Sequence, residues 1–85
     1  MSKHEKLKEK LLQVPVNFSY DEMVALLNSF GYHVANRGRT SGSAVMFYNQ
    51  DSGDKIMFHK PHPGNELKKY ILNMIIEKLK KNKML

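Results

Sequence analysis

The chain has 85 residues, of which 41% are hydrophobic and none is cysteine, and its formal net charge is +6. A chain this short can bury one small core, so residues 1–85 are expected to form a single domain. The composition excludes disulfides, thiolate zinc sites and cysteine nucleophiles, and no apolar run approaches the roughly 18 residues of a membrane span.

A short lysine-rich helix is predicted at the N-terminus, within residues 1–14. Leu7 and Leu11, with Leu12 beside them, give it one narrow apolar stripe, so we expect a peripheral element. Pro15 ends it, because proline disfavours helical geometry in the residue before it. The opening MSKHEKLKEK carries charges where a secretory signal needs an apolar stretch, which predicts a cytoplasmic protein without a cleaved leader.

A longer helix is predicted from about Tyr20 to Phe30. Ser19 and Glu22 have the spacing of a capping box, and Phe18 stands where a hydrophobic staple would pack on the helix. Gly31 supplies the left-handed residue that closes it. One helical face carries the apolar side chains Met23, Leu26, Leu27 and Phe30.

Short β-type segments follow, over Tyr32 to Ala35, Ala44 to Tyr48 and Lys55 to Phe58. Apolar residues alternate in the second and third segments, as one buried face requires. The polar stretch NQDSGD between these two segments is typical of a hairpin, so they should be antiparallel neighbours. The stretch NRGRTSG between the first two is too long for a tight turn and predicts an exposed basic loop.

The stretch HKPHPGN leads into a second long helix, and the last residues, 82–85, are expected to fray. Its apolar positions are Leu67, Tyr70, Ile71, Met74, Ile75 and Leu79, and its polar surface is supplied mostly by Lys68, Lys69, Lys78, Lys80 and Lys81. A three-stranded antiparallel sheet with two helices on one face is the simplest way to bury these stripes. The sequence therefore predicts an α+β, two-layer domain.

The positive charge lies mainly in the last third of the chain. Residues 55–85 hold eight lysines against two glutamates, hence +6, whereas residues 1–14 carry +2 and residues 15–54 carry −2. A basic face of this kind attracts phosphate backbones or acidic proteins, and it also serves solubility.

The order helix, three strands, helix is that of the double-stranded-RNA-binding domain, and the stretch GRTSGSAVMFYNQDSGDKIMFHKPHPGNELKKYILNMIIEKLK closely resembles toxins of the HicA family. The similarity is clearest in HPGNELK before the last helix and in the GS pair before the middle strand. With SYDEMVALLNSFGYHV it covers about Phe18 to Leu79. The resemblance implies a dsRNA-binding-like fold, metal-independent cleavage of messenger RNA without a cofactor, and a neutralising antitoxin of the HicB type.

The sequence departs from the family at one position. The catalytic histidine of the family follows the GS pair directly, and here Ala44 follows Gly42 and Ser43. Either the chain uses another residue, or it has lost cleavage, or a histidine was replaced by alanine. The sequence alone leaves these three open.

Two histidines are candidates for the proton transfers of metal-independent RNA cleavage, which needs a base for the 2′-hydroxyl and an acid for the leaving oxygen. His59 and His62 lie on either side of Lys60, just before the last helix, whose first amides can receive a phosphate. The alternative for His62 is a hydrogen bond within the turn, and for His59 a solvated position facing away from the core. Without a third ligand nearby, no metal site is expected. Of the others, His33 is expected to be structural and His4 solvated.

Several polar residues are candidates for binding RNA. Arg37, Arg39 and Ser41 lie in the basic loop and Ser43 at its end, where they could hold phosphates or simply be solvated. Lys60 belongs to the same candidate surface. Lys68 and Lys69 open the last helix, where this fold sets lysines against the RNA backbone, although they too could be a solvated face. Tyr32 and Tyr48 are assigned to packing.

Two other classes of function remain at this point. A non-catalytic RNA-binding or protein-binding module would keep the fold and lose the chemistry, and Ala44 is its main support. A winged-helix DNA-binding protein is disfavoured, because the strand-rich centre stands between only two substantial helices.

Overall fold

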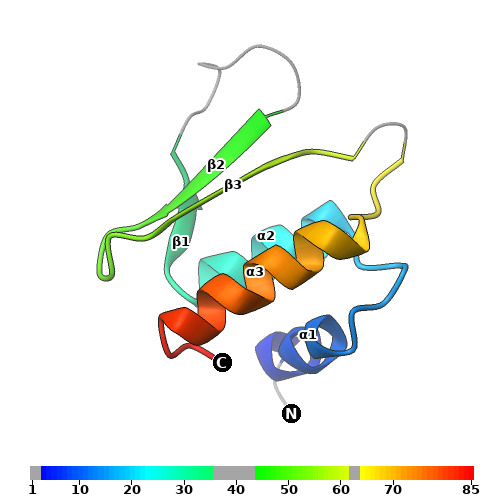
Figure 1. Cartoon of the computed structure of the whole chain (residues 1–85), viewed down its shortest axis with the longest axis horizontal. Helices are drawn as coiled ribbons and strands as arrows, with labels where there is room; N and C mark the ends of the chain where they lie inside the picture. Colours follow the sequence, from blue (N-terminus) through cyan, green and yellow to red (C-terminus); the bar gives the residue numbers. More distant parts are fainter. Residues whose placement is uncertain (1–2, 36–43, 62–63) are drawn as a thin grey trace.

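A computed structural model of the chain describes residues 3–35, 44–61 and 64–85. Its elements are α1 (Lys3–Leu12), α2 (Tyr20–Ser29), β1 (Tyr32–Val34), β2 (Ala44–Asn49), β3 (Lys55–His59) and α3 (Lys69–Lys81). The predicted α+β order is therefore confirmed, as a dsRNA-binding-like α-β-β-β-α arrangement preceded by an extra helix. Figure 1 shows the sheet as one layer, with α2 and α3 running across one of its faces and α1 beyond these helices, away from the sheet.

The sheet has the order β1-β2-β3, and both pairings are antiparallel. Burial alternates along β2 and β3, so that the face toward the helices carries the buried side chains Val45, Phe47, Asn49, Ile56 and Phe58. The rings of Phe47 and Phe58 stack there with centroids 5.8 Å apart. The predicted hairpin is confirmed, with Gly53 at φ 75° in its turn.

Asn49 is a buried polar residue on this otherwise apolar face, with 1% of its surface exposed. Its Nδ2 donates to the carbonyl oxygen of Phe30 at 2.9 Å, at the end of α2. Its Oδ1 accepts from the backbone N–H groups of Asp51 and Ser52, at 2.9 and 3.1 Å. One side chain therefore joins the hairpin turn to the end of a helix and satisfies all the polar atoms that it buries.

Helix α2 is specified by its two ends, as predicted. Ser19 Oγ accepts from the backbone N–H of Glu22 at 3.0 Å, and the Glu22 carboxylate accepts from the backbone N–H of Ser19 at 2.9 Å, which completes the capping box. Phe18 and Met23, the two positions of the hydrophobic staple, are both fully buried. Gly31 adopts φ 94° directly after the helix.

Helix α1 lies beyond α2 and α3 (Figure 1), and its apolar stripe packs against the core. Leu7 and Leu11 belong to the core cluster, whereas Leu12 is 45% exposed and lies outside the stripe. Lys10 Nζ lies 2.8 Å from the carboxylate of Glu22 and so holds α1 against the start of α2. Burial alone would raise the pKa of Glu22, but its hydrogen bonds, that with Lys10 foremost, outweigh this effect and hold the pKa below its usual value.

Helix α3 begins later than expected, with Lys68 as its N-cap residue and Lys69 as its first residue. Leu67 before it is buried, but its N–H bonds to the carbonyl oxygen of Phe18 and not within a helix. Tyr70, expected on the apolar face, is 66% exposed. The buried face consists of Ile71, Leu72, Ile75, Ile76 and Leu79.

The residues after α3 form a Schellman motif at its C-terminal end. Lys83 adopts φ 61°, its N–H bonds to the carbonyl oxygen of Lys80 at 3.0 Å, and the N–H of Met84 bonds to that of Leu79 at 2.8 Å. Met84 and Leu85 are partly buried against the core. The motif needs a left-handed residue at position 83, and lysine gave no sign of one in the sequence.

Candidate nucleic-acid interface

One end of the sheet brings two of the candidate positions face to face. Ala44, the first residue of β2, and His59, the last residue of β3, are direct partners in the antiparallel register. Their neighbours Val45 and Phe58 are buried under the helices. Because side chains alternate along a strand, Ala44 and His59 project together from the opposite, open face of the sheet. An imidazole therefore lies directly across from the position after the GS pair.

Lys60 extends this end of the sheet toward the helices. Its Nζ lies 5.3 Å from the centroid of the Tyr20 ring, and the edge of that ring meets Phe58 at a centroid distance of 6.2 Å. Burial, with a smaller effect from the charge of Asp21, raises the pKa of the Tyr20 hydroxyl above its ordinary value. His59 and Lys60 thus share one end of the molecule but lie on different sides of the sheet.

A short backbone pairing sets the starts of α2 and α3 side by side. The N–H of Tyr20 bonds to the carbonyl oxygen of Asn65 at 2.7 Å, the N–H of Leu67 bonds to that of Phe18 at 2.8 Å, and Ser19 and Glu66 form an antiparallel bridge between them. Figure 1 shows both helices starting at the same side of the molecule and running in the same direction. Their positive dipole ends therefore point to the same region as the end of β3.

The start of α3 suits an anion. Its N-cap residue, Lys68, makes no side-chain capping hydrogen bond, and its first turn contains no acidic residue. Lys68 and Lys69 are both exposed. Backbone N–H groups without a side-chain acceptor, at the positive end of a helix and beside two ammonium groups, form a site that a phosphate can occupy.

We refer to this region as the basic corner, defined by His59, Lys60, Lys68 and Lys69. Three of the four were predicted for their charge and one as a proton carrier, and the structure brings all four to one end of the molecule. Tyr20 was missed by the sequence analysis, which considered Tyr32 and Tyr48 instead. Its position directly after a capping residue was the available signal.

Five of the positions named from the sequence lie outside the described residues, namely Arg37, Arg39, Ser41, Ser43 and His62. Their roles stay predictions. The two remaining histidines differ from expectation, since His33 was expected to be structural and His4 to be solvated. His33 is exposed on β1, whereas His4 bonds to the hydroxyl of Ser29 and packs edge-on against Phe30 with centroids 4.9 Å apart.

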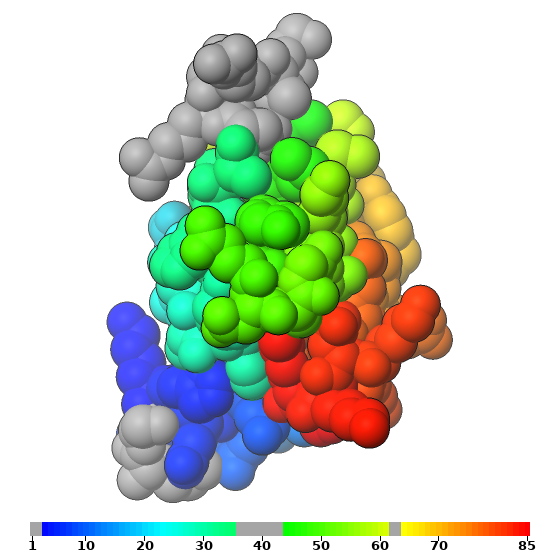
Figure 2. Space-filling view, turned by 90° about the vertical axis from the view of Figure 1, so that its left-hand side faces the viewer, coloured from blue at the N-terminus to red at the C-terminus, as the bar shows by residue number. Residues whose placement is uncertain are grey.

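Other lysines of α3 lie far from the basic corner. Lys78, Lys80 and Lys81 are in the last turn of the 13-residue helix, about 14 to 18 Å along it from its start. Figure 2 views the molecule from this end and shows the last turn of α3, in red, beside the tip of the β2–β3 hairpin, in green. The basic surface is therefore divided between the two ends of one helix.

Within residues 3–35, 44–61 and 64–85, no three histidine or acidic side chains are grouped closely enough to hold a metal ion. In the same part of the chain, no helix has the length and apolar character needed to cross a membrane.

The model of a family described as the HicA toxin of bacterial toxin–antitoxin systems matches residues 20–81, from the first residue of α2 to the last residue of α3. No curated protein and no solved structure matches the chain.

Proposed function

The chain belongs to the HicA toxin family of bacterial toxin–antitoxin systems, and we propose that it binds and cleaves messenger RNA in the cytoplasm and is neutralised by a HicB-type antitoxin. The observation that best supports this proposal is the basic corner, where the exposed ammonium groups of Lys60, Lys68 and Lys69 lie near the uncapped start of α3 and His59 lies at the same end of the molecule, on the open face of the sheet. A ribose-phosphate group needs a proton acceptor and positive charge of this kind if it is to be cleaved without a metal.

In this proposal His59 takes the proton from a ribose 2′-hydroxyl, whose oxygen attacks the neighbouring phosphorus. The bond from phosphorus to the 5′-oxygen breaks, and that oxygen must receive a proton. We assign this second step to His62. Because Ala44 is the register partner of His59, an imidazole at position 59 lies one strand away from the position where the family carries its histidine.

The ammonium groups of Lys60, Lys68 and Lys69 hold the RNA backbone in this proposal. They are exposed, and charge-assisted hydrogen bonds to phosphate oxygens are among the stronger contacts available to them. Arg37, Arg39, Ser41 and Ser43 are proposed to contact the same strand. An antitoxin that covers the basic corner would compete with RNA for it.

A second function is favoured by Ala44 itself. A HicA-like chain without its histidine could bind RNA, or a protein, and cleave nothing. It would then show RNA binding that weakens steeply with salt, while labelled RNA stays intact through a long incubation.

Growth after induced expression separates the two functions. We expect the unmodified chain to arrest growth, His59→Ala and His62→Ala to relieve the arrest, and His33→Ala, a matched change of an exposed histidine, to leave it unchanged. Toxicity from Ala44→His alone would contradict the first function and establish the chain as a disabled enzyme. Purified protein that fails to bind RNA would contradict both.

A further inference from the structure

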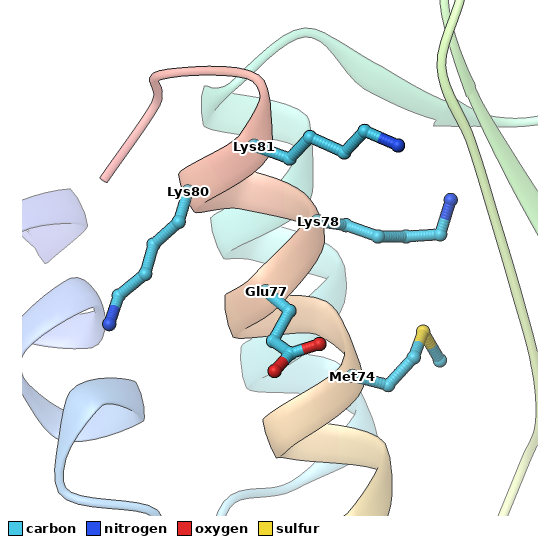
Figure 3. A pocket seen from close by; sticks show the side chains of 5 residues that line it. All are labelled: Met74, Glu77, Lys78, Lys80 and Lys81. Atoms are coloured by element: carbon cyan, nitrogen blue, oxygen red, sulfur yellow. The ribbon is translucent and has the colours of Figure 1, made fainter.

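A hollow of about 420 Å³ lies at the C-terminal half of α3, away from the basic corner. Figure 3 shows the side chains that line it, Met74, Glu77, Lys78, Lys80 and Lys81. The proposed reaction uses none of these residues.

The hollow has an apolar part and a charged rim. Met74 is partly buried against the core, and the aliphatic stems of the lysines add to the apolar surface. Lys78 Nζ is already engaged, 2.6 Å from the carbonyl oxygen of Lys55 and 3.3 Å from the carboxylate of Asp54. Its ammonium group therefore forms the edge of the hollow that faces the β2–β3 hairpin.

The remaining lysines do not converge on one point. In Figure 3 the side chain of Lys80 extends toward α1, whereas that of Lys81 extends toward the sheet, and Glu77 lies between them. Both lysines are exposed. Positive charge spread around an apolar floor does not suit a single phosphate. It suits an extended segment that carries several negative charges and an apolar side chain.

The amount of charge supports the same conclusion. Lys78, Lys80, Lys81 and Lys83 stand against the single acid Glu77 in the last part of the chain. Favourable interaction with the negative end of the helix dipole accounts for lysines in a last turn. It does not account for the hollow beside them.

We infer that this hollow is a docking site for an acidic segment of a protein partner, with an apolar side chain against Met74 and carboxylates on Lys80 and Lys81. The chemistry of the site carries this inference. It rests on the proposed function only in taking the partner to be the antitoxin. Because the two sites lie at opposite ends of α3, the partner would be anchored at a place that RNA bound to the basic corner leaves open.

The test uses the full chain and two labelled synthetic peptides, one alternating glutamate with leucine and one with glycine in place of every leucine. We expect the first peptide to bind, and the second to bind more weakly. Lys80→Glu with Lys81→Glu should weaken the first peptide about tenfold. Lys68→Glu with Lys69→Glu, which changes the net charge equally, should change its affinity by less than about twofold. Amide shifts of the unmodified chain on titration should change most over residues 74–83.

The same variants are tested with a short single-stranded RNA. Equal weakening of the peptide by both double variants would show general charge attraction and overturn the inference. The inference would also be overturned if the peptide did not bind. The same holds if the double variant of Lys80 and Lys81 lost more RNA affinity than the double variant of Lys68 and Lys69. If RNA affinity is insensitive to Lys68 and Lys69, the proposed function fails while the docking site can still stand.

Discussion

The side chain of Asn49 makes buried hydrogen bonds that an apolar side chain cannot replace. Its side chain makes three hydrogen bonds, to Phe30, Asp51 and Ser52, from a position that is 1% exposed. An Asn49→Leu variant would fill the space but leave these backbone groups without their partner. We expect the free energy of unfolding to fall by about 2 to 3 kcal/mol, measured by urea denaturation. Asn73→Leu, at an exposed position of α3, should change it by less than about 0.5 kcal/mol.

The left-handed backbone conformation of Lys83 costs free energy that it would not cost at a glycine. A non-glycine residue in the left-handed region costs roughly 1 kcal/mol or more, and the Schellman motif holds Lys83 there at φ 61°. Lys83→Gly should therefore raise the free energy of unfolding by about 0.5 to 1 kcal/mol. Glu77→Gly, inside the same helix, should lower it by about 1 kcal/mol. A lower thermal midpoint for Lys83→Gly would contradict this account of the helix end.

At the scale of elements, a small polar network joins the end of the β2–β3 hairpin turn to β1 and to α3. Tyr32 Oη donates to the carboxylate of Asp54 at 2.7 Å, and Lys78 Nζ lies 3.3 Å from its other oxygen. Burial would raise the pKa of Asp54, but the hydrogen bonds from Tyr32 and Lys78 outweigh it and hold the pKa below its ordinary value. Burial and the bond to Asp54 raise the pKa of Tyr32.

This network predicts the direction of acid sensitivity. A carboxylate whose pKa is lower in the folded chain stabilises the fold above its unfolded pKa, about 4, and that stability is lost as pH falls through the folded value. Asp54 and Glu22 are both of this type. We expect the free energy of unfolding to decrease as the pH falls below about 4. In the Asp54→Asn variant this decrease should be less steep over the same pH range. Urea denaturation from pH 7 downward measures both slopes.

The predictability of the elements follows from how local their causes are. Helix α2 was predicted almost to the residue because Ser19, Glu22 and Gly31 specify its ends within the chain that forms it. The start of α3 was misplaced because Leu67 pairs with the backbone of Phe18. That partner is distant in sequence, so no local pattern shows it. The left-handed residue at position 83 could not be predicted, because lysine is rarely used at such a position.

At the scale of the whole molecule, the charge was easier to predict than its arrangement. The lysine positions located the positive third of the chain and its spread along the last helix, but only the fold shows that the end of β3, with His59 and Lys60, lies near the start of α3 (Figure 1). The pairing of Ala44 with His59 likewise depends on strand register, which one residue of slippage would change. The sequence could therefore name the members of the basic corner but not which of them face each other.

The divided charge predicts how RNA binding should respond to salt. If Lys60, Lys68 and Lys69 each neutralise one phosphate, replacing all three by alanine should reduce the slope of log K against log salt concentration by about 2 for a single strand. Replacing Lys80, Lys81 and Lys83 by alanine changes the net charge equally and should leave the slope nearly unchanged. Fluorescence anisotropy with labelled RNA at several salt concentrations measures it. Equal slopes for the two triple variants would place RNA at both ends of α3.

The hydrogen bond from Lys78 to the carbonyl oxygen of Lys55 has a consequence beyond the folded monomer. Strand β3 is at the margin of the sheet, where an unsatisfied carbonyl can pair with a strand of another molecule. The ammonium group occupies that carbonyl and places a charge where a second chain would have to approach. In a Lys78→Met variant this protection would be gone. Self-association that grows with protein concentration, visible as light scattering, would then accompany any loss of stability.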